Sequence, residues 1–348
     1  LLRAAQALQV QDPAMLQRAA EAIGLDWFAC TDHSYDFSYQ SDDYRQLCDP
    51  QAKRDALLQQ LSSLDPGGPL PVYGEEVSCG NVFGENVHLL VLGNREHIEG
   101  NGDGGRRWFN NRPELTIPEV IERAQGLPCW AAHPKTKMGL LEKIIFRRGQ
   151  WHPEDLHPGL TGLQFWNGNT GIDFLMGRAF WVKRLIQGEK WLPGGGTDAH
   201  GDLNRSTGVK TPLISLWANR DHRFGSVRSW FPIDGKMDLE ALLESMKQGQ
   251  ALVGTGPWLT LQLENSGAIR LIAQSNEDFG AIRRIVIFTT LKGAIAEMAQ
   301  SIDPSPGTED LSHFVELRIE PKENARYLRA ELHTTQEERA ITSPLWLE

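Results

Sequence analysis

The alternation of helical segments with short apolar runs, between residues 12 and 200, constrains the fold more than any other feature of the sequence. Asp12 is a good N-cap, Pro13 suits the first helical position, and Gly24 is placed to end the helix. Residues 25–30 (LDWFAC) then predict a short buried strand. A repeated helix–strand order implies a parallel sheet or a barrel.

The same order recurs further along the chain. Strands are predicted at 87–92, 128–132, 160–166 and 191–196, and helices at 119–125 and 174–187. We therefore expect residues 1–256 to form an α/β domain built around these strands.

The pattern changes after about residue 250. A last amphipathic helix, capped by Asp238 and closed by Gly249, precedes the segment GTGP at 254–257. Apolar and polar residues then alternate with a period of two in LTLQLE, IRLIAQ, RRIVIFTT, FVELRIE and YLRAELHTT. Such alternation is typical of antiparallel strands, so residues 257–348 predict a separate β-sandwich-like module.

Composition excludes several classes of partner. The 348 residues carry a formal net charge of -10 with no long basic run, so no nucleic-acid partner is expected. No stretch approaches the roughly 20 apolar residues of a membrane-spanning helix. The four cysteines form no Cys-x-x-Cys pair, which favours reduced, mostly buried thiols and a cytoplasmic setting. The chain opens at Leu1 rather than Met, which suggests a missing upstream segment and leaves secretion open.

Three histidines follow apolar runs directly and precede turns, namely His33, His133 and His200. The carboxyl ends of strands converge on one face of a barrel or parallel sheet, where active sites are built. Each histidine alone would more often be a capping or solvated residue at a strand end. Three such ends, two of them with an aspartate beside or near the histidine, favour a metal site instead.

Asp198 and His200 give the sharpest local signal, because residues i and i+2 of an extended segment point the same way. Imidazole and carboxylate together suit zinc, manganese or iron. Glycines at 194–196 and 201 would let the backbone turn tightly beside bound ions. The alternative is a turn in which Asp198 only caps a helix.

Two further positions carry candidate ligands. Glu75 and Glu76 follow an apolar run, so one carboxylate should face inward and the other outward, with a solvated pair as the alternative. His88 opens the run HLLVLG and is either a strand-edge residue, which the pattern alone favours, or a ligand. Asn167 either lines the pocket or shapes a turn. Candidate contacts to an anionic small-molecule substrate, each of which would more often be a surface charge, are Lys135, Arg147, Arg148 and Arg205.

Read in order, six segments resemble the polymerase-and-histidinol-phosphatase (PHP) superfamily of metal-dependent hydrolases. They are GLDWFACTDH at 24–33, GEEVS at 74–78, HLLVLG at 88–93, AAHP at 131–134, GLQFWNG at 162–168 and GGTDAHG at 195–201. The resemblance implies a distorted barrel of seven strands and helices over residues 1–256, two or three divalent ions, and usually hydrolysis of phosphoesters.

The later part of the chain is similar to the CehA/McbA branch of this superfamily. The similarity rests on GQALVGTGP at 249–257, on the β-rich tail, and on the closing segments YLRAELHTT and AITSPLWL. That branch joins the barrel to a C-terminal β module and includes members that cleave carbamate or amide bonds. The resemblance therefore implies a phosphoesterase or, alternatively, an amide, ester or carbamate hydrolase.

The resemblance also implies roles for single residues. His33 would bind one ion, Glu76 would bridge two, and His88 with His133 would complete a second site. Asp198 would bind the ion that it shares with Glu76.

His200 would join His33 at its ion, and Asp32 would orient His33 or act as an acid near the leaving group. The superfamily's first strand ends in His-x-His, about 30 residues before Thr-Asp-His, and residues 1–31 lack that pair. Either the chain starts downstream of the pair, or the first metal site has lost two ligands. In the second case, a module that keeps metals without turnover is the rival interpretation.

Overall fold

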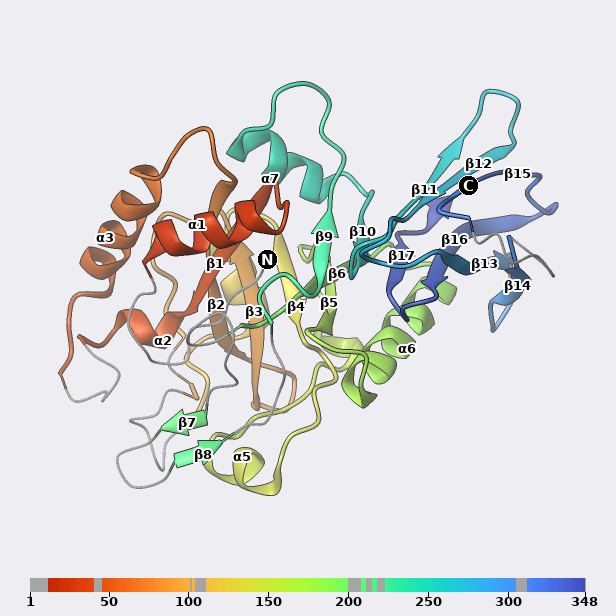
Figure 1. Ribbon diagram of the computed structural model, residues 1–348. Coiled ribbons are helices and arrows are strands. Elements are labelled where there is room, and N and C mark those ends of the chain that lie inside the picture. Colours follow the sequence, from red (N-terminus) through yellow and green to blue (C-terminus); the bar gives the residue numbers. More distant parts are fainter. Residues whose placement is uncertain are drawn as a thin grey trace.

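The computed structural model describes residues 12–40, 46–100, 102–103, 111–199, 208–210, 215–217, 223–304 and 312–347. These residues form an α/β structure in which a curled, mixed six-stranded sheet is followed by antiparallel β sheets (Figure 1). His200 and Arg205 lie outside the described residues, so the expectations for them stay open.

The first sheet has its strands in sequence order. They are β1 (Trp27–His33), β2 (Leu70–Gly80), β3 (Asn86–Leu92), β4 (Cys129–Ala132), β5 (Gly162–Asn167) and β6 (Leu192–Gly196). Neighbouring strands run parallel except at β3, which is antiparallel to both β2 and β4. A short connection joins β2 to β3, and only antiparallel strands can be joined so tightly. The start of β3 therefore lies at the same edge as the carboxyl ends of the other five strands.

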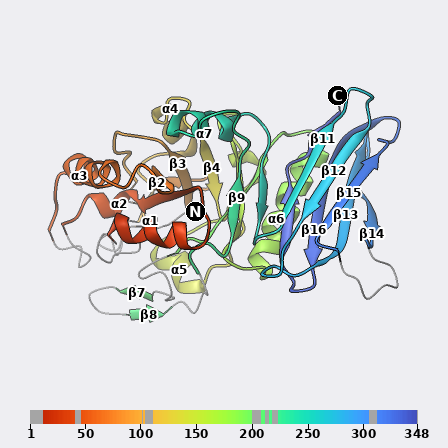
Figure 2. The same cartoon turned by 45° about the horizontal axis from the view of Figure 1, so that its top comes forward.

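Helices pack around this sheet (Figure 2). They are α1 (Pro13–Ala22), α2 (Ser34–Phe37), α3 (Pro50–Ser62), α4 (Ile117–Arg123), α5 (Leu140–Ile145), α6 (Ile172–Ile186), α7 (Leu239–Lys247) and the 3-10 turn η1 (Pro153–Asp155). The predicted caps are confirmed at both ends of this series. Asp12 accepts a hydrogen bond from the Ala14 amide at 3.1 Å, and Asp238 accepts one from the Ala241 amide at 2.9 Å.

The two faces of the sheet bury different sets of side chains. The inner face carries an apolar layer that includes Ala29, Leu90 and Trp130 and is covered by Leu242 and Met246 of α7. The outer face packs against α4 and α6 in one cluster and against α1 and α3 in another. Because α7 covers the apolar part of the inner face, the polar side chains of that face gather toward the carboxyl ends of the strands.

The second half of the chain is mainly antiparallel, as predicted. Its larger sheet has the order β14-β13-β16-β17-β10-β9, with β18 paired to β16, and its smaller sheet has the order β11-β12-β15. The strands are β9 (Arg228–Trp230), β10 (Leu252–Gly254), β11 (Trp258–Leu263), β12 (Ile269–Gln274), β13 (Ile282–Leu291), β14 (Met298–Ile302), β15 (Phe314–Ile319), β16 (Ala325–Thr334), β17 (Arg339–Thr342) and β18 (Leu345–Trp346). Residues 257–304 and 312–347 contain no helix. A shared apolar core packs the two sheets face to face.

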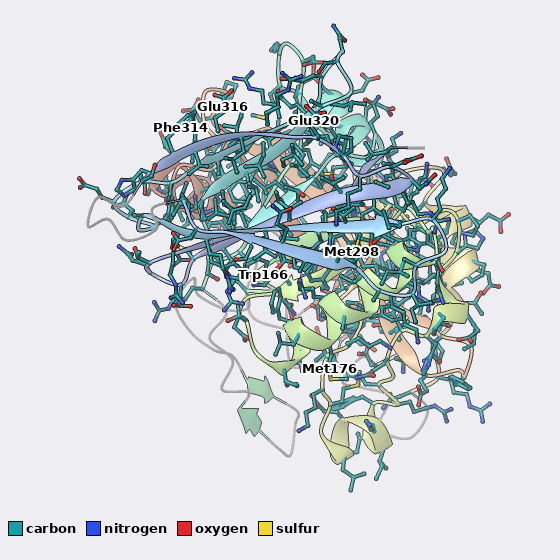
Figure 3. The ribbon with its side chains drawn as sticks, turned by 90° about the vertical axis from the view of Figure 1, so that its right-hand side faces the viewer. Trp166, Met176, Met298, Phe314, Glu316 and Glu320 are labelled. Carbon is teal, nitrogen blue, oxygen red and sulfur yellow. The ribbon has the colours of Figure 1, made fainter. Side chains whose placement is uncertain are left out.

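The boundary expected at residue 256 falls between β10 and β11, yet β9 and β10 already pair with the larger sheet. That sheet also contacts α6, since the Arg178 guanidinium donates to the Glu331 carboxylate of β16 at 2.7 Å. In Figure 3, which looks from the side of the β module, α6 with Met176 lies below the strands that carry Met298 (β14) and Phe314 (β15). A short pair, β7 (Gly208–Lys210) with β8 (Ser215–Trp217), stands apart from both sheets.

Two expectations from composition can be compared with the described residues. All four cysteines are free, and three of them are buried, as predicted. Among the described helices, none is both long enough and apolar enough to cross a membrane.

Candidate metal centre

Four of the predicted ligands meet at the carboxyl edge of the first sheet. His33 ends β1, Glu76 lies in β2, and His133 follows β4. His88 joins them because β3 is reversed, so that a residue near its start reaches the same edge. The sequence pattern alone favoured a strand-edge role for His88, but its side chain is buried in this group.

Glu76 lies at the middle of the cluster. Its Oε1 atom is 2.5 Å from His88 Nδ1 and 3.1 Å from His133 Nε2. The His33 and His88 rings meet edge to face with centroids 4.8 Å apart, and His88 meets His133 in the same way at 5.1 Å. Three imidazoles therefore surround one carboxylate.

Three of these residues form a buried group that could hold one metal ion. The potential ligand atoms of His33, Glu76 and His88 all lie within 4.8 Å of one another. Nitrogen and carboxylate oxygen are ligands that zinc, manganese and iron accept. His133, with its side chain 18 % exposed, is the most accessible member of the cluster and adds a further donor beside Glu76.

His33 and Glu76 have the protonation states that a metal ligand needs, whereas His88 would have to give up a proton to bind an ion. Burial, outweighing the attraction of Glu76, lowers the pKa of His33 to about 3, so this imidazole stays neutral as a ligand must. Burial also disfavours a charge on Glu76 and on His88. The neighbouring imidazoles nevertheless hold the pKa of the Glu76 carboxyl well below its usual range, and two carboxylates raise the pKa of His88 to about 9.

The backbone is strained at two of the predicted ligands. His133 has φ of 29° and Asp198 has φ of 48°, which non-glycine residues adopt rarely and which often marks a functional site. Hydrogen bonds attach both turns to side chains of β5. Gln164 accepts from the His133 amide at 2.8 Å, and the Asn167 side chain donates to Asp198 Oδ2 at 3.0 Å. Asn167 thus orients Asp198 and lines the adjoining pocket.

Glu75 lies on the opposite face of β2 from Glu76 and is also fully buried. The two carboxylates point to opposite faces of the sheet, as expected, but Glu75 faces a second buried layer and not solvent. It pairs with Arg54 of α3 at 3.0 Å and accepts from the Ile98 amide at 3.0 Å. Asp32 is in register with Glu75, and its charge acts on Arg54, so it lies on the face of the sheet away from His33.

Two basic candidates are placed in structural contacts. The Lys135 ammonium donates to the Trp151 carbonyl and lies 4.3 Å from the centre of the Phe180 ring. Arg148 donates through Nε to Asp103 at 2.8 Å. The structure therefore brings Asn167 to the cluster, but it turns Lys135 toward the protein interior.

Asp103 is the residue of this cluster that the sequence did not reveal. It lies in a glycine-rich loop, is 4 % exposed, and its Oδ2 is 2.9 Å from His88 Nε2. Burial disfavours its charge, yet His88 and Arg148 hold the pKa of its carboxyl well below the usual range. No periodicity or motif marks this position, because the loop GNGDGG has neither.

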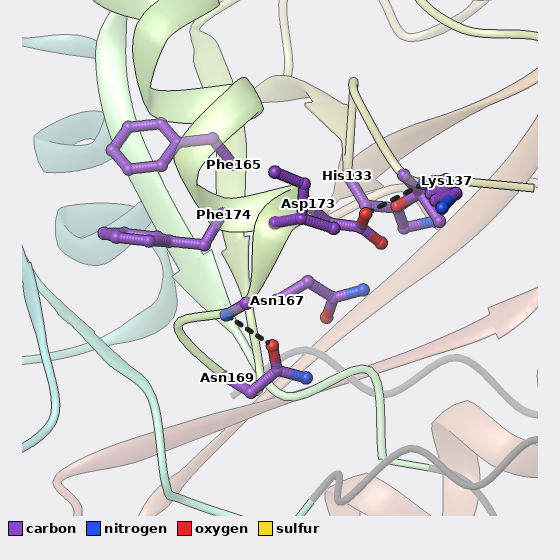
Figure 4. A pocket seen from close by; sticks show the side chains of 10 residues that line it. His133, Lys137, Phe165, Asn167, Asn169, Asp173 and Phe174 are labelled. Atoms are coloured by element: carbon purple, nitrogen blue, oxygen red, sulfur yellow. Dashed lines mark hydrogen bonds between the residues drawn. The ribbon is translucent and has the colours of Figure 1, made fainter.

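A cavity of about 290 Å³ adjoins the cluster between β5 and the start of α6. Figure 4 shows the Phe165 and Phe174 rings on one side of it and His133 on the other, with Asn167 and Asn169 between them. The remaining lining residues are Thr136, Lys137, Gly171, Ile172 and Asp173. One lysine and one aspartate balance in charge, so the cavity is lined by aromatic, aliphatic and amide groups without a dominant charge.

Comparisons with known proteins add no assignment: no family model, no curated protein and no solved structure matches this chain.

Proposed function

We propose that the protein is a metal-dependent hydrolase whose centre is the cluster around Glu76. The observation that carries this proposal is the buried group of His33, Glu76 and His88, whose donor atoms lie close enough to hold one ion. Neutral His33 and ionised Glu76 match the protonation states that a bound cation requires. The strained turns at His133 and Asp198 supply further donors at the same edge.

We also propose that the curled first sheet is a PHP-type barrel and that the centre takes two or three ions. The resemblance gives Glu76 to two ions, and the contacts of its Oε1 with His88 and His133 support the ion that these two histidines would bind. Asp198, oriented by Asn167, would bind the other ion that Glu76 shares. His200 would join His33 at its ion, as the family resemblance implies.

A divalent ion lowers the pKa of bound water from its bulk value to about 7 and polarises the scissile phosphoryl or carbonyl group. The residues of this chain would hold the ions, orient the ligands and position the substrate. His133 is the cluster member that also lines the cavity, so the scissile group would lie between His133 and the cavity mouth.

A phosphoester is the first candidate substrate, as the family resemblance implies. The cavity favours a second candidate, an ester, amide or carbamate bond. Its apolar residues Phe165, Ile172 and Phe174 and the amide of Asn169 suit an uncharged organic group better than a phosphate.

Parallel rate assays would test both candidates. The protein, loaded with zinc or manganese, would be incubated with p-nitrophenyl phosphate, p-nitrophenyl acetate and an aryl carbamate. We expect hydrolysis of at least one, loss of rate after chelation, recovery on adding metal, and no recovery in Glu76→Gln. Tight metal binding without hydrolysis of any of the three would favour a binding module instead.

A further inference from the structure

The two ring nitrogens of His88 face different carboxylates. Its Nδ1 lies 2.5 Å from Glu76 Oε1, inside the group that could hold an ion. Its Nε2 lies 2.9 Å from Asp103 Oδ2, on the other side of the ring. One nitrogen is therefore available to an ion only if the other carries the proton.

Asp103 is itself held in place by two donors. The Ser78 hydroxyl donates to Oδ1, and Arg148 Nε donates to Oδ2 at 2.8 Å. Ser78 lies opposite His88 in the β2–β3 register, so both side chains reach Asp103 from the same face of the sheet.

Arg148 is fixed beside the start of β3. The Asn86 amide donates to the carbonyl of Arg147 at 2.8 Å, and the Gly149 amide donates to the carbonyl of Asn86 at 2.9 Å. The backbone on both sides of Arg148 is thus attached to the strand that carries His88.

These contacts favour a supporting role for Asp103 over that of a metal ligand, and the group that could hold an ion consists of His33, Glu76 and His88. Both oxygens of Asp103 accept hydrogen bonds, and the guanidinium of Arg148 beside it would repel a divalent cation. What remains for Asp103 is to accept the proton on His88 Nε2. A carboxylate that accepts from the outer nitrogen of a ligating histidine fixes the tautomer and orientation of the ring and makes the inner nitrogen a better donor.

We propose that Asp103 is a positioning residue of the metal centre, holding His88 as the Nε2–H tautomer so that Nδ1 binds the ion. This inference rests on the metal site of the proposed function but not on the reaction. Ser78 and Arg148 act through Asp103, because their hydrogen bonds to its two oxygens hold the carboxylate toward the His88 ring. Asp32, which the family resemblance implied would orient His33 or act as an acid near the leaving group, lies on the other face of the sheet.

Zinc affinity tests the proposal. The dissociation constant for zinc alone would be measured by competition with a chromophoric chelator for wild type, Asp103→Asn and a matched control, Glu331→Gln. Glu331 is also a buried carboxylate paired with arginines, but it lies in β16 of the β module. We expect Asp103→Asn to bind zinc about 10- to 100-fold more weakly and Glu331→Gln to bind it as wild type does.

A spectroscopic readout separates positioning from general destabilisation. Long-range ¹H–¹⁵N spectra of the zinc-loaded wild type should show His88 protonated at Nε2 and bound through Nδ1. Ser78→Ala, which removes one hydrogen bond and no charge, should weaken zinc binding by a smaller factor in the same direction, even where Asp103→Asn folds poorly.

Zinc binding to Asp103→Asn within threefold of wild type would overturn the proposal, as would an equal loss in Glu331→Gln or coordination of His88 through Nε2. A wild type that binds zinc with the expected tautomer but hydrolyses no substrate would leave this inference standing and remove the proposed function.

Discussion

Adjacent carboxylates on β2 offer a matched pair of substitutions with opposite expected effects. Glu75 and Glu76 are both buried, yet Glu75 faces Arg54 of α3 whereas Glu76 faces the histidine cluster. Replacing each with glutamine removes one charge at nearly constant volume. We expect Glu75→Gln to lower stability and Glu76→Gln to remove metal binding.

The loss of stability expected for Glu75→Gln follows from the burial of its partner Arg54. Arg54 and Glu75 are both fully buried and 3.0 Å apart, and without Glu75 the guanidinium keeps the carbonyls of Gly74 and Asn94, the Phe37 ring and the attraction of Asp32. Breaking a buried pair by removing one partner costs about 3–5 kcal/mol. At roughly 2.1 cal/mol/K of unfolding entropy per residue, 348 residues unfolding together convert that cost to a fall of ~4–7 °C in melting temperature.

Glu76→Gln leaves no permanently charged partner behind, since its neighbours His33, His88 and His133 can all be neutral. Its metal-free melting temperature should therefore fall less than that of Glu75→Gln. Zinc at 100 times its dissociation constant should stabilise wild type and Glu75→Gln by about 2.7 kcal/mol, and should not stabilise Glu76→Gln.

Thermal melts with zinc and with chelator would measure both effects in one series. If metal-free Glu75→Gln melts at the same temperature as the wild type, the argument from the buried pair is refuted. A full zinc shift in Glu76→Gln would refute its assignment as a ligand.

Three further predictions concern other parts of the molecule. Asp198→Ala should abolish hydrolysis, because the metal loses a ligand, and should keep the free energy of unfolding within about 1 kcal/mol of wild type. Rate assays and thermal melts would measure the two effects. Ile172→Lys, at an exposed position on the cavity rim, should lower kcat/KM for aryl esters more than for aryl phosphates if the cavity binds the organic group. Glu331 has its carboxyl pKa lowered because Arg329 and Arg178 outweigh its burial, so its stabilisation is present above about pH 4.5 and is lost as pH falls toward the folded-state pKa. The stability difference between wild type and Glu331→Gln, measured by denaturant unfolding, should therefore shrink below pH 4.5.

Local signals in the sequence predicted the elements that carry clear caps and periodicity. Asp12 with Pro13 predicted α1, and the change to a period of two predicted the strands of the β module. The same Asp-Pro signal occurs at Asp49 and Pro50, where Asp49 accepts from the Gln51 amide at 3.0 Å to cap α3. That helix was missed because its apolar residues follow no clear helical period.

Other features depend on tertiary contacts that no local pattern encodes. The reversal of β3 is set by the short connection after β2, and it alone brings His88 to the cluster. The strand predicted at 191–196 is confirmed as β6, so glycines 194–196, which were also expected to let the backbone turn, lie within it. A Cβ atom at Gly194 would lie 2.8 Å from the Trp130 ring, and one at Gly195 would lie 2.2 Å from Val253. Close packing of the strand therefore explains these two glycines.

Anomalous X-ray diffraction at the zinc edge, from crystals of the zinc-loaded protein, tests the central claim most directly. The account predicts a strong peak about 2.0–2.2 Å from a nitrogen of His33, from His88 Nδ1 and from a carboxylate oxygen of Glu76. The account would be contradicted if the zinc in such crystals bound only at other residues, while Glu76 still contacted His88 and His133 directly.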